Sequence, residues 1–385
     1  MRRKPICLIL ASCMAVILTL SADSSEAIDP KAGKLDAEGK IVWYDAKHLA
    51  IEGKGWLDTE SLYDRLPLDA KGRVSAAVWG LSRCSAGLYV RFATDGKVVQ
   101  VRWALNGAIR VEPASNGAPD AFSLRNMPAG GASGIDLYVK DKQGEFRLLG
   151  NARPKDVVSV ARFDLPGGEE YVLYLPLYNG IEQLEIGIPE GKTLSKIPAL
   201  SPSSSVVFYG TSITQGGCAS QPGLAATSMV GRELDVPVVN LGFSGNGNMD
   251  ASLAHLLSEL DPAVYVLDCL ANMGEGRVST HVEPFVKILR ESRPTTPIVL
   301  VEDSSIKNLP TSKGNVLRGI CEKLRKEGDK NVRFLSNKGM LGDDAQTTVD
   351  GCHHNDLGMA RQAAVLVKCI QAILEEERTR IGARR

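Results

Sequence analysis

Three residue types that together perform nucleophilic catalysis stand at defined places in the chain: Ser212, Asp350 and His353. Ser212 follows a run of strand-forming residues that ends in a small-residue turn, "VVFYGTSIT". A serine hydroxyl is a weak nucleophile, so it needs a base within hydrogen-bond reach. His353 can be that base. Asp350, three residues earlier, can fix the imidazole tautomer through a tight turn.

A serine nucleophile also needs donors for the oxyanion that forms when it attacks a carbonyl group. The backbone N–H of Ser212 is one candidate, because the residue opens a helix. The N–H of Gly245, in "NLGFSGNGN", is a second, since glycine lets the backbone approach a ligand closely. The side-chain amide of Asn272, in "DCLANMG", is a third.

Each of these residues also has a purely structural interpretation. Ser212 could cap a helix, Gly245 could serve a turn, and Asn272 could cap the segment after its strand. Four neighbouring side chains could instead form a metal site: Asp350, His353, His354 and Asp356. The adjacent histidines also leave open which one is the base.

The second half of the chain alternates strand-like and helix-like segments, which predicts a parallel sheet with helices on both faces. In such sheets the site lies beyond the carboxyl ends of the strands, where the serine, glycine, asparagine and Asp-x-x-His segments all fall. The helix at 279–292 has capping-box spacing between Thr280 and Glu283. The expected strand and helix pairs are 206–210 with 224–234, 237–241 with 250–260, 263–268 with 279–292, 297–302 with 312–327, and 332–335 with 357–377.

The first half contains short alternating runs and turns, which indicates an all-β sandwich or jelly roll. The segment "LYVRFATDGKVVQVRWAL" predicts a hairpin around Asp95-Gly96, and "GIDLYVKDKQGEFRLL" and "EYVLYLPLYNGIEQLEIGI" follow the same pattern. A Pro/Ser-rich stretch without periodicity follows. The expected organisation is a β-sandwich domain at 35–190, a linker at 191–204 and a catalytic α/β domain at 205–385.

Residues 1–27 are expected to be a secretory signal peptide, with a basic start, "MRRKP", an apolar run and a small-residue cleavage site before Ile28. The apolar run is too short for an ordinary membrane span, so none is expected in the mature chain. A lipoprotein box ending at Cys13 is the weaker alternative, because the apolar run continues past it. The sequence therefore predicts a secreted or periplasmic protein.

The amino-acid composition argues against nucleic acid as a binding partner. The formal net charge is +0 and aromatic residues make up 5%, so neither a basic nucleic-acid surface nor a base-stacking platform is expected. No CxxC pair occurs, which disfavours a cysteine-based zinc site. Export would permit disulfides, and Cys218 and Cys352, near the nucleophile and the base, could form one.

The sequence segments around the serine, the glycine, the asparagine and the Asp-x-x-His pair together resemble those of the SGNH, or GDSL-like, hydrolases. Ser212, Gly245, Asn272 and His353 stand in the family's chain order. The element Gly134-x-Asp-Leu-Tyr resembles the GxDLY-type N-terminal domain of a bacterial branch of these esterases. The resemblance covers nearly the whole mature chain. It implies a flavodoxin-like catalytic domain, with Ser212, His353 and Asp350 as the triad.

The chain departs from the family pattern at three positions. Thr211 replaces the usual Asp before the nucleophile, Ala271 and Met273 flank the asparagine, and His354 replaces a common proline. None of these changes removes a catalytic group. No G-x-S-x-G pentad is present, which disfavours an α/β-hydrolase.

The expected function is a serine esterase that removes acyl groups, acetyl above all, from carbohydrate through an acyl-enzyme, without metal or cofactor. The alternatives are an acylhydrolase acting on other small esters and an inert carbohydrate-binding protein. Arg83, in "WGLSRCSAG", is a candidate for contact with the site from the first half.

Overall fold

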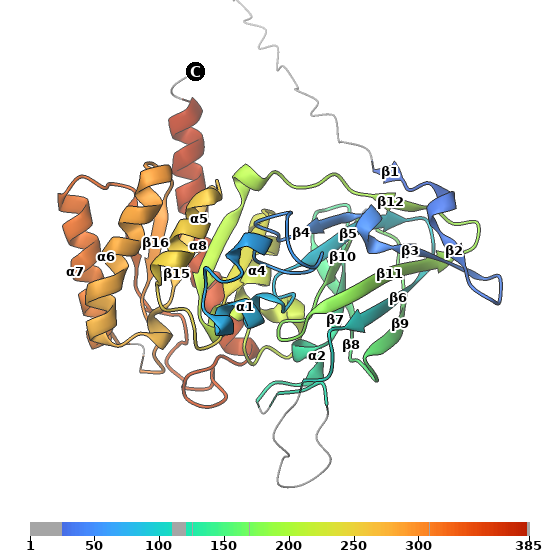
Figure 1. Ribbon diagram of the computed structural model, residues 1–385, viewed down its shortest axis with the longest axis horizontal. Coiled ribbons are helices and arrows are strands. Elements are labelled where there is room, and N and C mark those ends of the chain that lie inside the picture. The colour runs from blue at the N-terminus through green and yellow to red at the C-terminus, as the bar shows by residue number, and fades with distance from the viewer. Residues whose placement is uncertain (1–24, 110–120, 125, 169, 308, 383–385) are drawn as a thin grey trace, which may run out of the picture.

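The computed structural model describes residues 25–109, 121–124, 126–168, 170–307 and 309–382. It has two halves side by side (Figure 1): a β sandwich, followed by a parallel sheet between helices. The architecture is therefore mixed α/β, with a β domain preceding the α/β half. Most of the predicted signal peptide, with Cys13, lies outside the described residues.

The β domain contains two antiparallel sheets that pack face to face. In the described residues one sheet has the order β1-β12-β5-β10-β7-β8, with β4 beside β5, and the other has the order β2-β3-β11-β6-β9. Inward-facing side chains of both sheets, such as Phe92, Leu137, Trp103 and Ile186, form one buried core. The strands are β1 Glu26–Ala27, β2 Lys34–Leu35, β3 Ile41–Asp45, β4 Ala50–Glu52, β5 Tyr89–Thr94, β6 Val98–Leu105, β7 Ile135–Lys140, β8 Phe146–Ala152, β9 Val158–Asp164, β10 Glu170–Tyr174, β11 Ile181–Pro189 and β12 Leu194–Lys196.

Two of the three predicted hairpins are wrong. Strands β7 and β8 do pair, but β5 and β6, on either side of Asp95-Gly96, belong to different sheets, as do β10 and β11. The reason is that β5 is already paired with β10 on one side and with β12 and β4 on the other. The chain therefore passes from one sheet of the sandwich to the other at Gly96 instead of forming a hairpin. The local turn residues do not determine which of these two connections forms.

The second half is built on a parallel sheet of order β14-β13-β15-β16-β17, the 2-1-3-4-5 order of flavodoxin-like sheets. Its strands are β13 Val206–Gly210, β14 Val238–Gly242, β15 Val264–Asp268, β16 Ile298–Val301 and β17 Val332–Leu335. Alternate strand residues face opposite sides, so Val207 and Tyr209 pack in one core and Val206 and Phe208 in another. The sheet is thus apolar on both faces and needs cover on both.

Helices supply that cover. Helices α5 (Ala251–Glu259), α6 (Glu275–Ser292) and α7 (Ser312–Lys326) pack on one face, and α4 (Ala226–Leu234) and α8 (Asp356–Gly382) on the other. Helix α6 begins four residues before the predicted start, with Gly274 as its N-cap. The predicted capping box at Thr280 is wrong, since its hydroxyl donates within the helix to the Gly276 carbonyl.

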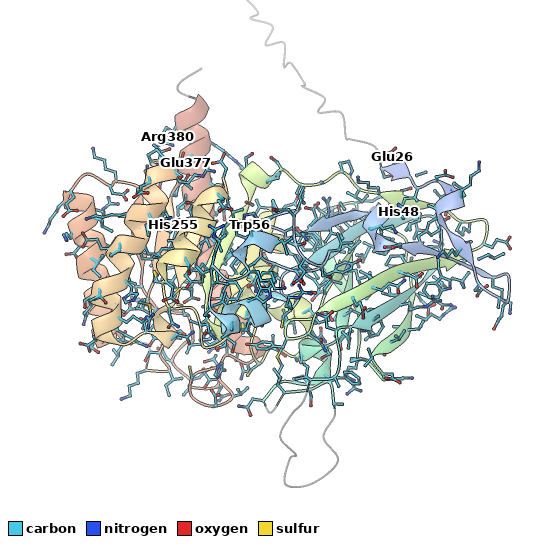
Figure 2. All side chains as sticks on the ribbon, in the orientation of Figure 1. Glu26, His48, Trp56, His255, Glu377 and Arg380 are labelled. Carbon is cyan, nitrogen blue, oxygen red and sulfur yellow. The ribbon has the colours of Figure 1, made fainter. Side chains whose placement is uncertain are left out.

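Helix α8 is long and apolar enough to cross a membrane by length and composition, with a mean hydropathy of 1.4 over its best window. Its apolar side is used inside the fold, because Met359, Leu366 and Ile370 are buried against α4 and the sheet. Its far end, which carries Glu377 and Arg380, projects from the molecule (Figure 2). Packing explains the apolar composition of this helix.

The β domain also contributes residues to the cores of the α/β half. Leu66, Val74 and Val78, from the segment after β4 and from helix α1 (Ala76–Ser82), are buried in the same cluster as α5 and α6. Trp56 lies where the halves meet (Figure 2), and its indole donates to Glu259 of α5 at 2.9 Å. The interface is therefore a continuous hydrophobic core with polar links at its edge.

The predicted linker includes the last strand of the β domain. Residues 194–196 form β12, which pairs with β5 and buries Leu194. Strand β1, at Glu26–Ala27, adds to the outer edge of β12. The segment that connects the halves without strand structure is accordingly shorter than the predicted one.

Candidate active site

The nucleophile candidate sits at the start of a short helix, α3 (Ser212–Gln215), directly after strand β13. Thr211 is the N-cap, and its hydroxyl accepts from the Ile213 N–H at 3.2 Å. A threonine can therefore cap this turn where an aspartate is usual in similar sequences. Ser212 is 7% exposed, and its Oγ lies 2.9 Å from Nε2 of His353.

His353 is held by Asp350 in a tight turn, as the three-residue spacing predicts. Nδ1 lies 2.8 Å from Oδ2 of Asp350, while Oδ1 accepts from the N–H groups of Cys352 and His353 at 3.0 and 2.8 Å. Partial burial acts to raise the pKa of Asp350, but hydrogen bonds from the His353 N–H, the imidazole and the Cys352 N–H outweigh it and lower the pKa to about 2. The ionised carboxylate can only accept, so Nδ1 donates to it and Nε2 is free to accept from the Ser212 hydroxyl.

His354 faces away from Ser212. It is fully buried, and its Nε2 lies 2.9 Å from the Ser304 hydroxyl, beyond strand β16. Burial lowers the pKa of His354 to about 4, so the ring is neutral near pH 7. Of the two adjacent histidines, only His353 is hydrogen-bonded to the serine.

The four side chains considered as metal ligands have separate partners. Asp350 binds His353, and His354 binds Ser304. Asp356 accepts from the N–H and hydroxyl of Ser220 at 2.8 and 2.6 Å. Within the described ranges no group of three or more His, Cys, Asp or Glu side chains is arranged to hold a metal ion.

Two of the three expected oxyanion donors are backbone groups in the loops after β13 and β14. Gly245 has φ of +70°, a conformation that favours glycine, and an added Cβ would meet only open space. Its N–H and that of Ser212 have no hydrogen-bond partner among the described residues. Both N–H groups are therefore free to donate to a ligand.

Asn272 lies in a short 3₁₀ turn after β15, and its amide is oriented by the glycine loop, which we define as residues 242–247. With Oδ1 turned toward this loop, it accepts from the N–H groups of Asn246 and Gly247 at 3.1 Å each. That orientation leaves Nδ2 as the group that can donate away from the loop. The side chain thus both holds the loop and presents a donor.

Residues from the β domain reach this site, but Arg83 is not among them. Arg83 pairs with Glu60 and Asp64 within the β domain. Instead, the Tyr178 hydroxyl donates to the Ser212 carbonyl at 3.3 Å, and the Asn126 amide lies 3.5 Å from Oδ2 of Asp350.

Two buried residues near the serine also escaped sequence reasoning. Gln215 is fully buried and links the two halves, and Arg65 of the β domain binds carbonyl oxygens at the end of β14. The only sequence signal for Gln215 was a large polar residue before two glycines in "SITQGG". Arg65 carried no signal, because nothing in the sequence places it beside β14.

The disulfide considered between Cys218 and Cys352 is not formed, because both side chains are free thiols in this structure. The other described cysteines, Cys84, Cys269, Cys321 and Cys369, are also free. The loops around the nucleophile and base are therefore held by hydrogen bonds, without a covalent link between them.

The parallel sheet and a Ser-His-Asp array at its carboxyl edge are the features of a serine hydrolase. Comparison with protein families matches residues 203–371 to the GDSL-like lipase/acylhydrolase family. Residues 41–194 match GxDLY, the N-terminal domain of SGNH-hydrolase-type esterases. The chain belongs to the GDSL-like lipase/acylhydrolase family.

Solved structures agree with this assignment. A putative GDSL-like lipase from Bacteroides ovatus is 30% identical, with a TM-score of 0.77, and the match covers 87% of this chain and 98% of that one. The salicylyl-acyltransferase SsfX3 of a tetracycline biosynthetic pathway is 20% identical, with a TM-score of 0.64 and coverage of 91% and 97%. A family two carbohydrate esterase from Clostridium thermocellum shares the fold at 13% identity, with a TM-score of 0.54 and coverage of 75% and 93%. No curated protein matches the chain at a significant level.

Proposed function

We propose that this protein is a serine esterase that removes acyl groups, acetyl above all, from carbohydrate through an acyl-enzyme. The observation that carries the catalytic part is the continuous array in which Ser212 Oγ, His353 and Asp350 are joined at 2.9 and 2.8 Å. The free N–H groups of Ser212 and Gly245 and the amide of Asn272 complete an oxyanion hole.

The first half of the reaction follows from this geometry. Ser212 Oγ attacks the ester carbonyl carbon while its proton passes to Nε2 of His353. The carbonyl oxygen gains negative charge and receives the three donors, and Asp350 stabilises the imidazolium. When the tetrahedral intermediate collapses, the bond to the leaving oxygen breaks, His353 protonates that oxygen, and the acyl group remains on Ser212.

The second half uses the same groups in reverse. His353 removes a proton from a water molecule, which attacks the acyl carbon. The new oxyanion occupies the same donors, and His353 returns the proton to Ser212 as the carboxylic acid leaves. No step needs a metal ion or an organic cofactor.

The carbohydrate substrate is proposed from likeness of fold. Family two carbohydrate esterases of two bacteria share the fold at 13% identity, which supports the class of substrate without naming the sugar. The β domain packs along the catalytic half and reaches the site through Tyr178 and Asn126, so it can form one wall of a sugar site.

The decisive experiment compares wild type with Ser212→Ala on acetylated polysaccharides and on p-nitrophenyl esters of two, four and eight carbons. We expect wild type to release acetate from the polysaccharides and to prefer the acetyl ester among the p-nitrophenyl esters. Ser212→Ala should cleave neither kind of substrate while keeping an unchanged circular dichroism spectrum. A serine-directed phosphonate should label Ser212 alone. Preference for the eight-carbon ester would replace the carbohydrate substrate with other esters. Sugar binding without any ester cleavage would favour an inert binding protein.

Dialysis against a chelator tests the metal-free mechanism directly. We expect kcat to stay unchanged, because Asp350 and His353 are bound to each other and to Ser212. Activity lost to the chelator and restored by zinc or manganese would contradict the triad and favour a metal hydrolase.

We also propose that the protein is exported, on the basis of its basic, apolar and small-residue N-terminus. Cleavage after Ala27 would remove β1 and leave the bond from the Ile28 N–H to the Leu194 carbonyl, at 2.9 Å, as the first link to β12. Sequencing the N-terminus of the mature protein should give Ile28. A lipid-modified Cys13 at the terminus would instead establish a lipoprotein.

A further inference from the structure

The β domain reaches the glycine loop through side chains that the catalytic mechanism does not use. Arg65 leaves the β domain at the segment between β4 and α1 and is 2% exposed. Its Nη1 donates to the carbonyl oxygens of Asn240 and Gly242 at 3.1 and 2.8 Å, and its guanidinium lies 4.9 Å from the centre of the Phe243 ring. These contacts fix the point where β14 ends and the loop carrying Gly245 begins.

Arg65 is held almost entirely by carbonyl oxygens. Its other nitrogens donate to the carbonyls of Leu81 and Cys84 at 2.7 and 2.8 Å. All of these hydrogen-bond partners are backbone carbonyl groups, and none of them is a carboxylate. Burial lowers the pKa of Arg65 to about 10, so it remains a cation near neutral pH. A buried cation that is held by carbonyl oxygens has lost its hydration, and its field favours negative charge nearby.

A second connection runs through Gln215, at the end of α3. Its Nε2 donates to the carbonyl of Leu177 in the β domain at 3.0 Å, and its Oε1 accepts from the Ser244 N–H at 3.0 Å. Ser244 directly precedes Gly245. One amide therefore joins the β domain to the residue next to the oxyanion donor.

A third connection acts on the nucleophile side. Tyr178, the neighbour of Leu177, donates to the carbonyl of Ser212 at 3.3 Å. An added Cβ on Gly217 would lie 2.8 Å from the Tyr178 hydroxyl, so this residue packs closely against the turn after α3. Both oxyanion loops are thus in contact with the same short segment of the β domain.

We propose that the β domain is part of the catalytic apparatus: Arg65, Tyr178 and the Leu177–Gln215–Ser244 link hold the Ser212 and Gly245 N–H groups in the geometry that receives the oxyanion. This inference rests on the proposed esterase function and extends it. These residues are positioning residues, because none contacts the reacting atoms. Misplacing donors by about 1 Å can cost roughly a hundredfold in rate.

The primary test is Gln215→Met, which keeps the length of the side chain and removes both hydrogen bonds. The matched control is Lys140→Met, which breaks another link between the halves, the 2.7 Å ion pair with Asp235, without touching either loop. With p-nitrophenyl acetate we expect Gln215→Met to lower kcat by about tenfold or more at unchanged KM, and Lys140→Met to change neither. A structural role alone would lower thermal stability without this split between kcat and KM.

A second measurement works without turnover. Hydrogen exchange followed by mass spectrometry should show faster exchange in the peptide covering 240–249 in Gln215→Met, faster exchange in the peptide covering 212–217 in Tyr178→Phe, and no change in either peptide in Lys140→Met. Arg65→Met is expected to act in the same direction, and Arg65→Lys to recover part of the loss.

The outcomes separate this inference from the proposed function. A wild-type protein that cleaves no ester contradicts the esterase function, while the exchange data still decide whether the β domain holds the loop. An active wild type with Gln215→Met within twofold in kcat, or with unchanged exchange at 240–249, overturns the positioning role. An equal loss in Lys140→Met would also overturn it, because the effect would then belong to the interface in general.

Discussion

Two neighbouring histidines have opposite environments although they differ by one position. His353 is half-buried between Ser212 and Asp350, while His354 is fully buried against Ser304. The backbone turn that closes at Asp350 directs the first ring toward the nucleophile, and the next residue then points into the protein. Adjacent identical residues can therefore serve catalysis and packing separately.

Alanine substitutions should separate these roles. We expect His353→Ala to lower kcat by roughly 10³-fold or more, with little change in the unfolding midpoint. His354→Ala should retain most of kcat and lose about 1–3 kcal/mol of unfolding free energy, because removing the buried imidazole leaves a cavity and takes the partner from the part-buried Ser304 hydroxyl. Steady-state kinetics and urea unfolding of both variants check this, and the reverse ranking would move the base to His354.

Asn272 combines two functions that substitutions can distinguish. Asn272→Ala removes the donor and the loop contact, and should lower kcat by about a hundredfold with little effect on KM. Asn272→Asp keeps an oxygen to accept from Asn246 and Gly247 but places a carboxylate where the donor stood. We expect the aspartate variant to be the slower one. An active aspartate variant would mean that Asn272 only holds the loop.

At the scale of elements, strand β7 explains the GxDLY motif physically. Asp136 accepts from the Gly223 N–H of the catalytic half at 2.7 Å and from Asn151 of β8 at 2.7 Å. An added Cβ on Gly223 would lie 2.5 Å from the Tyr138 ring. The Arg232 guanidinium stacks 4.3 Å from that ring. The motif is therefore a docking strand that joins the β domain to the segment after the nucleophile.

The docking strand should make stability depend on pH. Burial, although opposed by hydrogen bonds from Asn151 and Gly223, raises the pKa of Asp136 from 3.8 to about 6. Between about pH 4 and 6 the folded state therefore binds more protons at Asp136 than the unfolded state does. The contribution of Asp136 to the free energy of unfolding is accordingly present below pH 4 and is lost as pH rises through 6. Asp136→Asn should flatten the fall in unfolding free energy between pH 4 and 6. An unchanged slope would assign the dependence to other groups.

Sequence reasoning succeeded best where the signal is local. Helix α7 starts at Ser312 as predicted, and the order of strands and helices in the catalytic half follows from their periodicity. The Asp-x-x-His spacing identified a turn whose geometry is fixed within four residues. The two wrong hairpins and the missed Arg65 share one cause, because each depends on which distant segment lies alongside, and no local pattern encodes that.

At the scale of the whole molecule, the β domain has a core of its own and also supplies residues to the two cores of the α/β half. Leu66 and Val78 of the first half complete the cluster under α5 and α6, and Ala132 and Leu177 complete the cluster under α4 and α8. Apolar surfaces of this kind would be exposed to water if the halves separated. The protein should therefore be more cooperative than a pair of domains on a linker.

We expect a single thermal transition, because unfolding the β domain would remove part of the cores of the α/β half, and unfolding the α/β half would expose the apolar β-domain residues that pack there. The isolated segment 205–385 should be insoluble or should lack a cooperative transition, since it would expose the surface that Leu66 and Leu177 cover. Scanning calorimetry of the full chain and of the segment checks both statements. Two resolved transitions, or a stable segment, would show that the halves fold independently.

The contribution of the β domain to the cores of the α/β half limits the exchange of whole halves between related proteins. A chimera that joined this β domain to the α/β half of a relative would disturb the packing of Leu66 and Val74 in the cluster that also holds α5 and α6, as well as the contacts of Arg65 and Leu177. Such a hybrid would need matching exchanges on both sides of the interface. Directed evolution toward new acyl groups should therefore vary residues at the exposed rim of the site and keep the residues of the interface between the halves unchanged.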